Sequence, residues 1–267
     1  MNELDPNLTA PQTQTEPEVS EIPAPDPPWG FRDLAYVVAF TVTALLLSHL
    51  AAALIYTLLR WRVGGLPKLT QLAGDARFIL PVQFVAYVLT VGFIYLMVTW
   101  KYRRRFWEAV RWKAVGEQTS LFLTAGVMLA FASQLIPVLF PSDRPLPIEK
   151  LFNSPTSGYL LAAFGILIAP FVEELVFRGV MYPVFERRLG LMLAVVLTAA
   201  LFAAIHAPQL GRGWPQVTAI FVVGLALSYA RGRTGSLVPA YLIHLSYNST
   251  LFVLLYISTD HFRKLPS

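Results

Sequence analysis

Hydrophobic residues gather in seven long runs along this chain of 267 residues, with most polar residues lying between them. Each run approaches the roughly 20 apolar residues that a helix needs to cross a bilayer. The strand alternation of a membrane barrel is absent, and lipid tolerates no open sheet edge. The pattern therefore predicts an all-α, polytopic transmembrane helical bundle of about seven spans, within a range of six to eight. The predicted spans are Leu34–Leu59, Ile79–Thr99, Thr119–Phe140, Tyr159–Phe185, Leu191–His206, Gln216–Ala230 and Gly235–Ile257.

Composition also indicates an integral membrane protein. Hydrophobic residues make up 55% of the chain and charged residues 14%, whereas soluble domains carry about 25% charged residues. The chain contains no cysteine, which excludes disulfides, thiolate metal ligands and a cysteine nucleophile. Residues 1–32 differ from the rest because they are acidic and rich in proline. Such a segment buries too little apolar area to fold, so we expect a disordered tail at 1–32 and a helical domain at 33–267.

The formal net charge of +5 indicates membrane topology rather than nucleic-acid binding. Basic and aromatic residues are interleaved over residues 101–113, a mixture that suits an interface with anionic lipid headgroups. The two sides of the predicted bundle carry 11 and 9 Lys and Arg residues, a small bias that favours a cytoplasmic N-terminus. We therefore expect a protein of the cell membrane whose polar site opens toward the cytoplasm.

Ionisable side chains within the predicted spans are the first sign of chemistry, because hydrocarbon disfavours them unless they face a polar cavity. Glu174 and Arg178 are four residues apart on a helix, in the order that favours an ion pair. Glu173 lies about 100° around the helix and stays free for general-base chemistry. Pro170 removes a helical hydrogen bond just before the two acids. The alternative is that all three charges reach from the end of the span to the interface.

Two further motifs follow on the next hydrophobic runs. Phe202 and His206 share a helical face on a span that a short connection places antiparallel to the glutamate helix. His244 and Asn248 share a face within the last span, where two donors directed at one point could stabilise an oxyanion. Each motif alone also fits a structural interhelical hydrogen bond.

Taken in order, the three motifs resemble those of the CAAX protease and bacteriocin-processing family, which includes the type II CAAX prenyl proteases. The resemblance covers a catalytic core of about residues 158–250. It implies that Glu173 activates water with help from His206, and that His244 and Asn248 form the oxyanion hole. Glu174, Arg178 and Phe202 would then support the site.

The leading hypothesis is an intramembrane glutamic endopeptidase acting on membrane-associated proteins, with lipidated CAAX-type proteins among the candidate substrates. No cofactor is expected. Zinc bound by Glu173, His206 and His244 is an alternative, although the paired histidines of common zinc proteases are missing.

Two hypotheses from other classes stay open. One is a non-catalytic membrane scaffold or bacteriocin-immunity-type protein that keeps the polar residues without their chemistry. The other is a proton-coupled transporter that uses Glu173 and His206 as a relay. The absence of an internal repeat in the sequence counts against the transporter.

Overall fold

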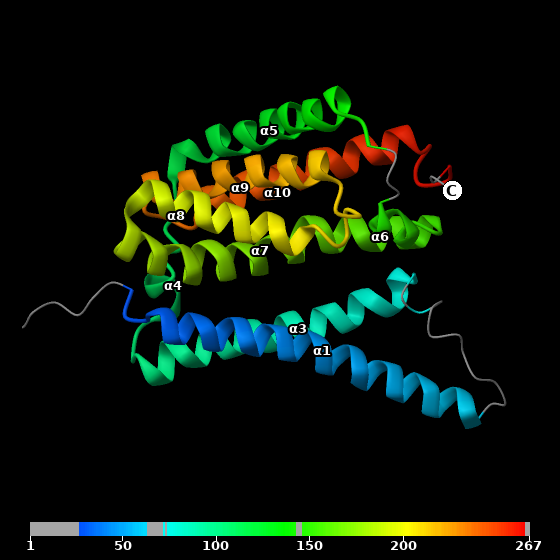
Figure 1. The fold of residues 1–267 in the computed structure, drawn as a ribbon, viewed down its shortest axis with the longest axis horizontal. Helices are drawn as coiled ribbons and strands as arrows, with labels where there is room; N and C mark the ends of the chain where they lie inside the picture. Colours follow the sequence, from blue (N-terminus) through cyan, green and yellow to red (C-terminus); the bar gives the residue numbers. More distant parts are fainter. Residues whose placement is uncertain (1–26, 63–71, 73, 143–145, 265–267) are drawn as a thin grey trace, which may run out of the picture.

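The structure is a computed structural model that describes residues 27–62, 72, 74–142 and 146–264. These residues form helices joined by short connections (Figure 1). Six are α-helices of 20 or more residues: α1 (Phe31–Arg62), α3 (Ala76–Leu96), α5 (Thr119–Leu139), α8 (Tyr182–His206), α9 (Trp214–Thr234) and α10 (Val238–Ser258). The glutamate motif lies on a composite helix made of α6 (Pro155–Ala163), the π-helix η4 (Phe164–Ile168), α7 (Ala169–Glu174), the π-helix η5 (Leu175–Met181) and the start of α8 (Tyr182–His206). The short elements are η1 (Met97–Lys101), α4 (Phe106–Ala109), η2 (Gly116–Gln118) and η3 (Pro147–Leu151).

The predicted fold class, an all-α helical bundle, is confirmed. The seven predicted spans correspond to fewer candidate spans in the structure. Among the described residues, five stretches are long and apolar enough to cross a membrane. The fourth, Pro155–His206, contains two of the predicted spans, which separate at Gly190, where φ is 76° and the chain reverses. Helix α9 corresponds to the sixth predicted span but is not one of the five, since Gln216 and Arg231 make it less apolar.

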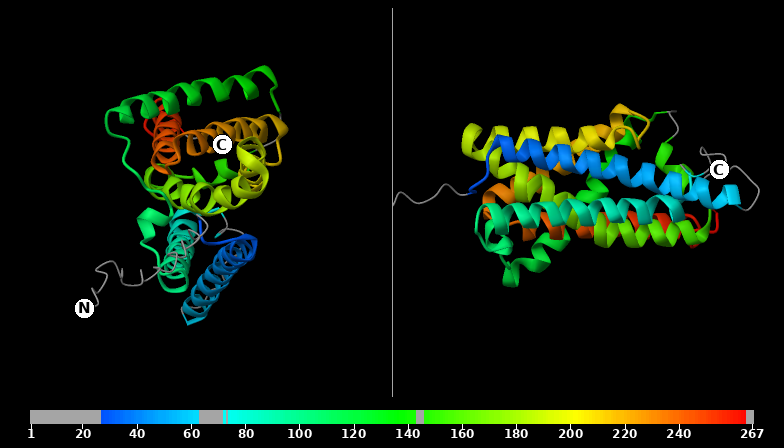
Figure 2. Two further views of the ribbon diagram at one scale, coloured as in Figure 1. Left: turned by 90° about the vertical axis from the view of Figure 1, so that its left-hand side faces the viewer. Right: turned by 90° about the horizontal axis from the view of Figure 1, so that it is seen from below.

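The helices form two groups that meet at α3. Figure 2 shows the pair α1 and α3 beside a larger bundle that contains α5 to α10. Phe40 of α1 stacks on Phe93 of α3 with ring centroids 4.3 Å apart. Tyr87 of α3 in turn stacks on Phe164, at the start of η4, with centroids 5.6 Å apart. Helix α3 therefore joins the N-terminal pair to the half of the chain that carries the three motifs.

Small residues allow the helices of the larger bundle to approach closely, as is common in membranes, where packing drives association. A Cβ atom on Gly126 of α5 would lie 2.0 Å from Ser246 Oγ and 2.3 Å from the Ile243 carbonyl oxygen of α10. A Cβ atom on Gly224 of α9 would lie 3.0 Å from the Cα atom of Ala199 on α8. These contacts fix α9 and α10, which carry much of the candidate site.

The segment before α1 is fastened to the glutamate helix. Trp29 is fully buried, and its Nε1 donates a hydrogen bond of 3.1 Å to the Val180 carbonyl. Arg187 donates one of 2.8 Å to the Trp29 carbonyl. Packed structure therefore begins before residue 33, the predicted boundary of the helical domain. The part of the predicted tail at residues 1–26 lies outside the described residues.

The close approach of α5 to α10 predicts that Gly126→Ala destabilises the protein by about 1–3 kcal/mol, because a backbone carbonyl blocks the added methyl group. Gly92→Ala on α3 is the matched control, since its Cβ would meet no atom within 4 Å. The control should be neutral or more stable by up to about 1 kcal/mol. Reversible unfolding in detergent micelles measures both, and equal stabilities would contradict the packing described here.

Candidate active site

The polar residues of the three motifs line one cavity of about 420 Å³. Glu173 comes from α7, His206 from the end of α8, and His244 and Asn248 from α10. Apolar side chains from neighbouring helices, among them Phe164 and Phe202, form much of the remaining wall. The structure thus brings together, within a largely apolar bundle, side chains that the sequence places on three separate helices.

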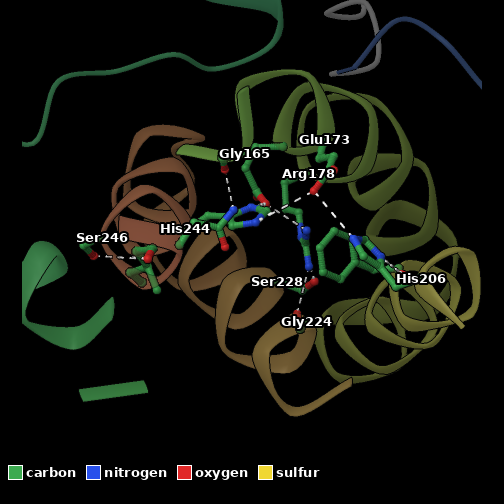
Figure 3. Close-up of polar contacts among 12 residues, drawn as sticks. Gly165, Glu173, Arg178, His206, Gly224, Ser228, His244 and Ser246 are labelled. Atoms are coloured by element: carbon green, nitrogen blue, oxygen red, sulfur yellow. Dashed lines mark hydrogen bonds and ion pairs between the residues drawn. The ribbon is translucent and has the colours of Figure 1, made fainter. Parts of the chain in front are cut away.

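Glu173 points between the two imidazole rings (Figure 3). Its Oε2 lies 3.9 Å from Nε2 of His206 and 3.8 Å from Nε2 of His244. Both distances exceed those of direct hydrogen bonds. The Glu173 side chain is 16% exposed and that of His206 14%, so both reach the cavity. The arrangement leaves the carboxylate in reach of a small molecule that also contacts an imidazole.

Hydrogen bonds at Nδ1 set the orientation of both histidines. Nδ1 of His206 lies 2.7 Å from the Phe202 carbonyl oxygen, and Nδ1 of His244 lies 2.8 Å from Oε1 of Glu174. A carbonyl and a carboxylate can only accept, so each Nδ1 carries the proton. Both Nε2 atoms are therefore presented to Glu173.

A buried ion pair lies directly behind this pocket. Glu174 and Arg178 are both 0% exposed, with Oε1 of Glu174 accepting from Nη1 of Arg178 at 2.9 Å. The same Oε1 accepts from His244, while Oε2 has no hydrogen-bond partner in the part of the chain that the structure describes. Complete burial overturns the alternative in which these two charges reach the membrane interface.

Arg178 also ties the glutamate helix to α9. Its Nε donates to Ser228 Oγ at 3.2 Å and its Nη2 to the Gly224 carbonyl at 3.1 Å. The guanidinium lies 4.5 Å from the centre of the Phe202 ring. Phe202 in turn contacts His206, with ring centroids 4.5 Å apart, and lies edge-on to His244 at 5.8 Å. The Phe202 ring thus lies between the Glu174–Arg178 ion pair and His206. It also packs against His244.

Asn248 occupies a position created by Pro170. In η4 the hydrogen bonds span five residues, as the bond from the Ala169 N–H to the Phe164 carbonyl shows. The next carbonyl, that of Gly165, would need a donor at position 170, and proline has none. Nδ2 of Asn248 donates to the Gly165 carbonyl instead, at 2.7 Å. The asparagine therefore satisfies a backbone group, and one of its two N–H groups remains for other partners.

The same arrangement recurs one π-helix later. The Tyr182 N–H bonds to the Phe177 carbonyl across five residues, and Pro183 then leaves the Arg178 carbonyl without a helical donor. Nε of Arg231 donates to that carbonyl at 3.1 Å. Arg231 is one of the 11 Lys and Arg residues counted on the side of the N-terminus, but it is 2% exposed, so its assignment to the membrane surface was wrong. Its charge is part of the support for the site.

The sequence analysis missed several residues of the site. Ser228 and Arg231 contact Arg178, and Gln83 and Tyr87 line the cavity from α3. None of these residues stands in one of the three motifs. One sequence signal could have indicated Arg231 and the role of Asn248, namely a proline five residues after the residue whose carbonyl they bind. This signal is informative only where the helix is known to be a π-helix.

The zinc alternative requires Glu173, His206 and His244 to converge on one point. Within the described ranges, no group of three or more His, Asp and Glu side chains is arranged so that it could hold a metal ion. The described arrangement therefore offers no support for the zinc alternative. The expectation that no cofactor is needed stays a prediction.

Comparison with known proteins places this geometry in a family context. Residues 155–250 match the family described as type II CAAX prenyl endopeptidase, Rce1-like. This segment is similar to a CAAX protease. The resemblance based on the three motifs is thus confirmed. An uncharacterized 24.3 kDa protein of Escherichia coli is 36% identical over 81 residues, which are 30% of this chain and 36% of that protein. The aligned part therefore spans about a third of this relative. No solved structure matches the chain.

The buried pair predicts that Arg178→Met lowers the free energy of unfolding by about 3–5 kcal/mol, because Glu174 would remain buried without its cation. Arg105→Met is the matched control, since the Arg105–Glu108 pair is solvent-exposed and should contribute less than about 0.5 kcal/mol. Denaturant-induced unfolding in mixed micelles compares the two. A similar small loss in both variants would contradict a supporting role for Arg178.

The proline argument predicts a second-site rescue. Asn248→Ala should cost about 1–3 kcal/mol, because the Gly165 carbonyl loses its donor. Adding Pro170→Ala supplies an N–H at the position that the π-helix requires, so the double variant should regain much of the lost stability. The unfolding midpoint is the readout. An unchanged or lower midpoint in the double variant would show that Asn248 does not replace the missing helical donor.

Proposed function

We propose that this protein is an intramembrane endopeptidase that hydrolyses peptide bonds of membrane-associated proteins. One observation carries the proposal: Oε2 of Glu173 faces Nε2 of both His206 and His244, at 3.9 and 3.8 Å, in one cavity. The three residues also lie within the segment that is similar to type II CAAX prenyl endopeptidases. The chain is an integral membrane protein by its apolar helices.

In this mechanism Glu173 and His206 activate water. A water molecule between them would donate to the carboxylate and to the bare Nε2 of His206, whose proton is held on Nδ1 by the Phe202 carbonyl. Such a water bridges groups that are too far apart to bond directly. A lone pair of the water oxygen can then attack the carbonyl carbon of a bound peptide.

His244 and Asn248 would stabilise the tetrahedral intermediate. His244 donates from Nδ1 to Glu174, so it must be an imidazolium to donate also from Nε2 to the oxyanion. The N–H of Asn248 that is not bound to Gly165 supplies the second donor.

Glu173 carries the proton that the water loses and later passes it to the leaving amine. The water oxygen bonds to the carbonyl carbon as one of its protons passes to Glu173. The intermediate then collapses, the C–N bond breaks, and Glu173 gives that proton to the leaving amine. No covalent bond between enzyme and substrate forms at any step.

The substrate class follows from the location of the site. The cavity lies among apolar helices, so a membrane-associated peptide reaches it more readily than a soluble one. Lipidated CAAX-type proteins are the first candidates, because residues 155–250 match a family described as type II CAAX prenyl endopeptidase. We propose that the protein resides in the cell membrane with the cavity open to the cytoplasm.

Peptide hydrolysis by the purified protein tests the proposal directly. Wild type, Glu173→Gln and the control Glu117→Gln, which changes an exposed glutamate on η2, are incubated with lipidated and unlipidated peptides. Loss of the general base should slow cleavage by about 10²–10⁴-fold in Glu173→Gln. The control should cleave at the wild-type rate.

Each reaction is repeated with a chelator. Cleavage that resists the chelator agrees with the proposed mechanism, whereas loss with chelator and recovery with zinc would replace it with a metal mechanism. Folded wild type that cleaves no peptide, or Glu173→Gln that cleaves normally, would contradict the proposal and favour the scaffold hypothesis.

A further inference from the structure

Tyr87 lines the same cavity as Glu173 but comes from α3, outside the matched segment 155–250. Its hydroxyl interacts electrostatically with the Glu173 carboxylate and with the Gln83 side chain, which line the same cavity. Gln83 lies one helical turn earlier on α3 and also lines the cavity. Two polar side chains of α3 therefore line the cavity together with Glu173 of α7, His206 of α8 and His244 of α10.

The Tyr87 ring is held firmly in place. It stacks on Phe164 with centroids 5.6 Å apart and planes inclined by 26°. Its other side contributes to a second, apolar hollow of about 360 Å³ lined by residues that include Phe84, Leu167 and Phe171. Tyr87 therefore lines both hollows, with its ring held by the stacking on Phe164.

Glu173 needs such a partner. Its distances to His206 and His244 are too long for direct hydrogen bonds, so the imidazoles alone do not fix the carboxylate. A flexible, partly exposed side chain would sample several rotamers, and misplacing a reacting group by about 1 Å can cost on the order of 100-fold in rate. A fixed hydroxyl donor would remove that freedom.

We propose that Tyr87 is a positioning residue that orients the Glu173 carboxylate toward His206 and His244, and that Gln83 orients the Tyr87 hydroxyl. The inference rests on the proposed function in one respect, namely that Glu173 is the group that activates water. The proposed hydrogen bond from Tyr87 to Glu173 does not depend on that function and is tested separately below.

The first test removes only the hydroxyl. Tyr87→Phe keeps the stacking on Phe164 and should lower kcat by about 10-fold to 100-fold, with KM and the thermal unfolding midpoint unchanged. Tyr95→Phe, the same change eight residues later on α3, should leave kcat unchanged. A kcat of Tyr87→Phe within twofold of wild type overturns the proposal, and so does a loss of kcat that merely parallels a loss of stability.

The second test asks whether Gln83 acts through Tyr87. Gln83→Leu should lower kcat less than Tyr87→Phe, and the double variant should be no slower than Tyr87→Phe alone. If the fold-losses of kcat multiply in the double variant, Gln83 acts independently of Tyr87. That result would contradict its proposed role in orienting the Tyr87 hydroxyl.

The third test does not need hydrolysis. Infrared difference spectra between each protein and its Glu173→Gln counterpart isolate the carboxyl band of Glu173. Removing the Tyr87 hydroxyl should shift this band, whereas Tyr95→Phe should leave it in place. If the Glu173 band shifts but the protein cleaves no peptide, the contact between Tyr87 and Glu173 is supported and the proposed function is refuted. An unshifted band refutes the positioning role whether or not peptides are cleaved.

Discussion

The fully buried carboxylate of Glu174 is the group on which the rest of the site depends. Its Oε1 accepts from Arg178 and from His244, and so joins the glutamate helix to α10. Arg178 extends the connection to α9 through Ser228 and the Gly224 carbonyl. A buried charge without its partner is strongly destabilising, so these helices are held in one relative arrangement. Glu174 thus binds the supporting groups and leaves its neighbour Glu173 free to face the cavity.

Two π-helices followed by prolines explain why polar side chains from other helices meet the glutamate helix where they do. Each proline leaves one backbone carbonyl without a helical donor, at Gly165 and at Arg178. In an apolar environment such carbonyls require partners. Asn248 and Arg231 supply them. The two interruptions of the glutamate helix therefore also determine where Asn248 and Arg231 contact it.

The lengths of the hydrophobic runs were sufficient to predict the helical bundle. The four-residue spacing of Glu174 and Arg178 was sufficient to predict their ion pair. The meeting of Glu173, His206 and His244 could be predicted only from the order of the motifs, because spacing within one helix says nothing about contacts between helices. Tyr87 and Arg231 escaped prediction for physical reasons. Tyr87 is one aromatic residue in an apolar helix, and Arg231 resembles a surface charge until the π register of η5 is known.

The central claim is that the pocket is complementary to a tetrahedral intermediate between Glu173 and His244. The most direct measurement is a structure of the protein bound to a peptide with a phosphinate in place of the cleaved amide. The account predicts one phosphinate oxygen about 2.7–3.1 Å from Nε2 of His244 and Nδ2 of Asn248, and the other between Glu173 and His206. A phosphinate bound away from these four residues, or one coordinated by a metal ion, would contradict the account.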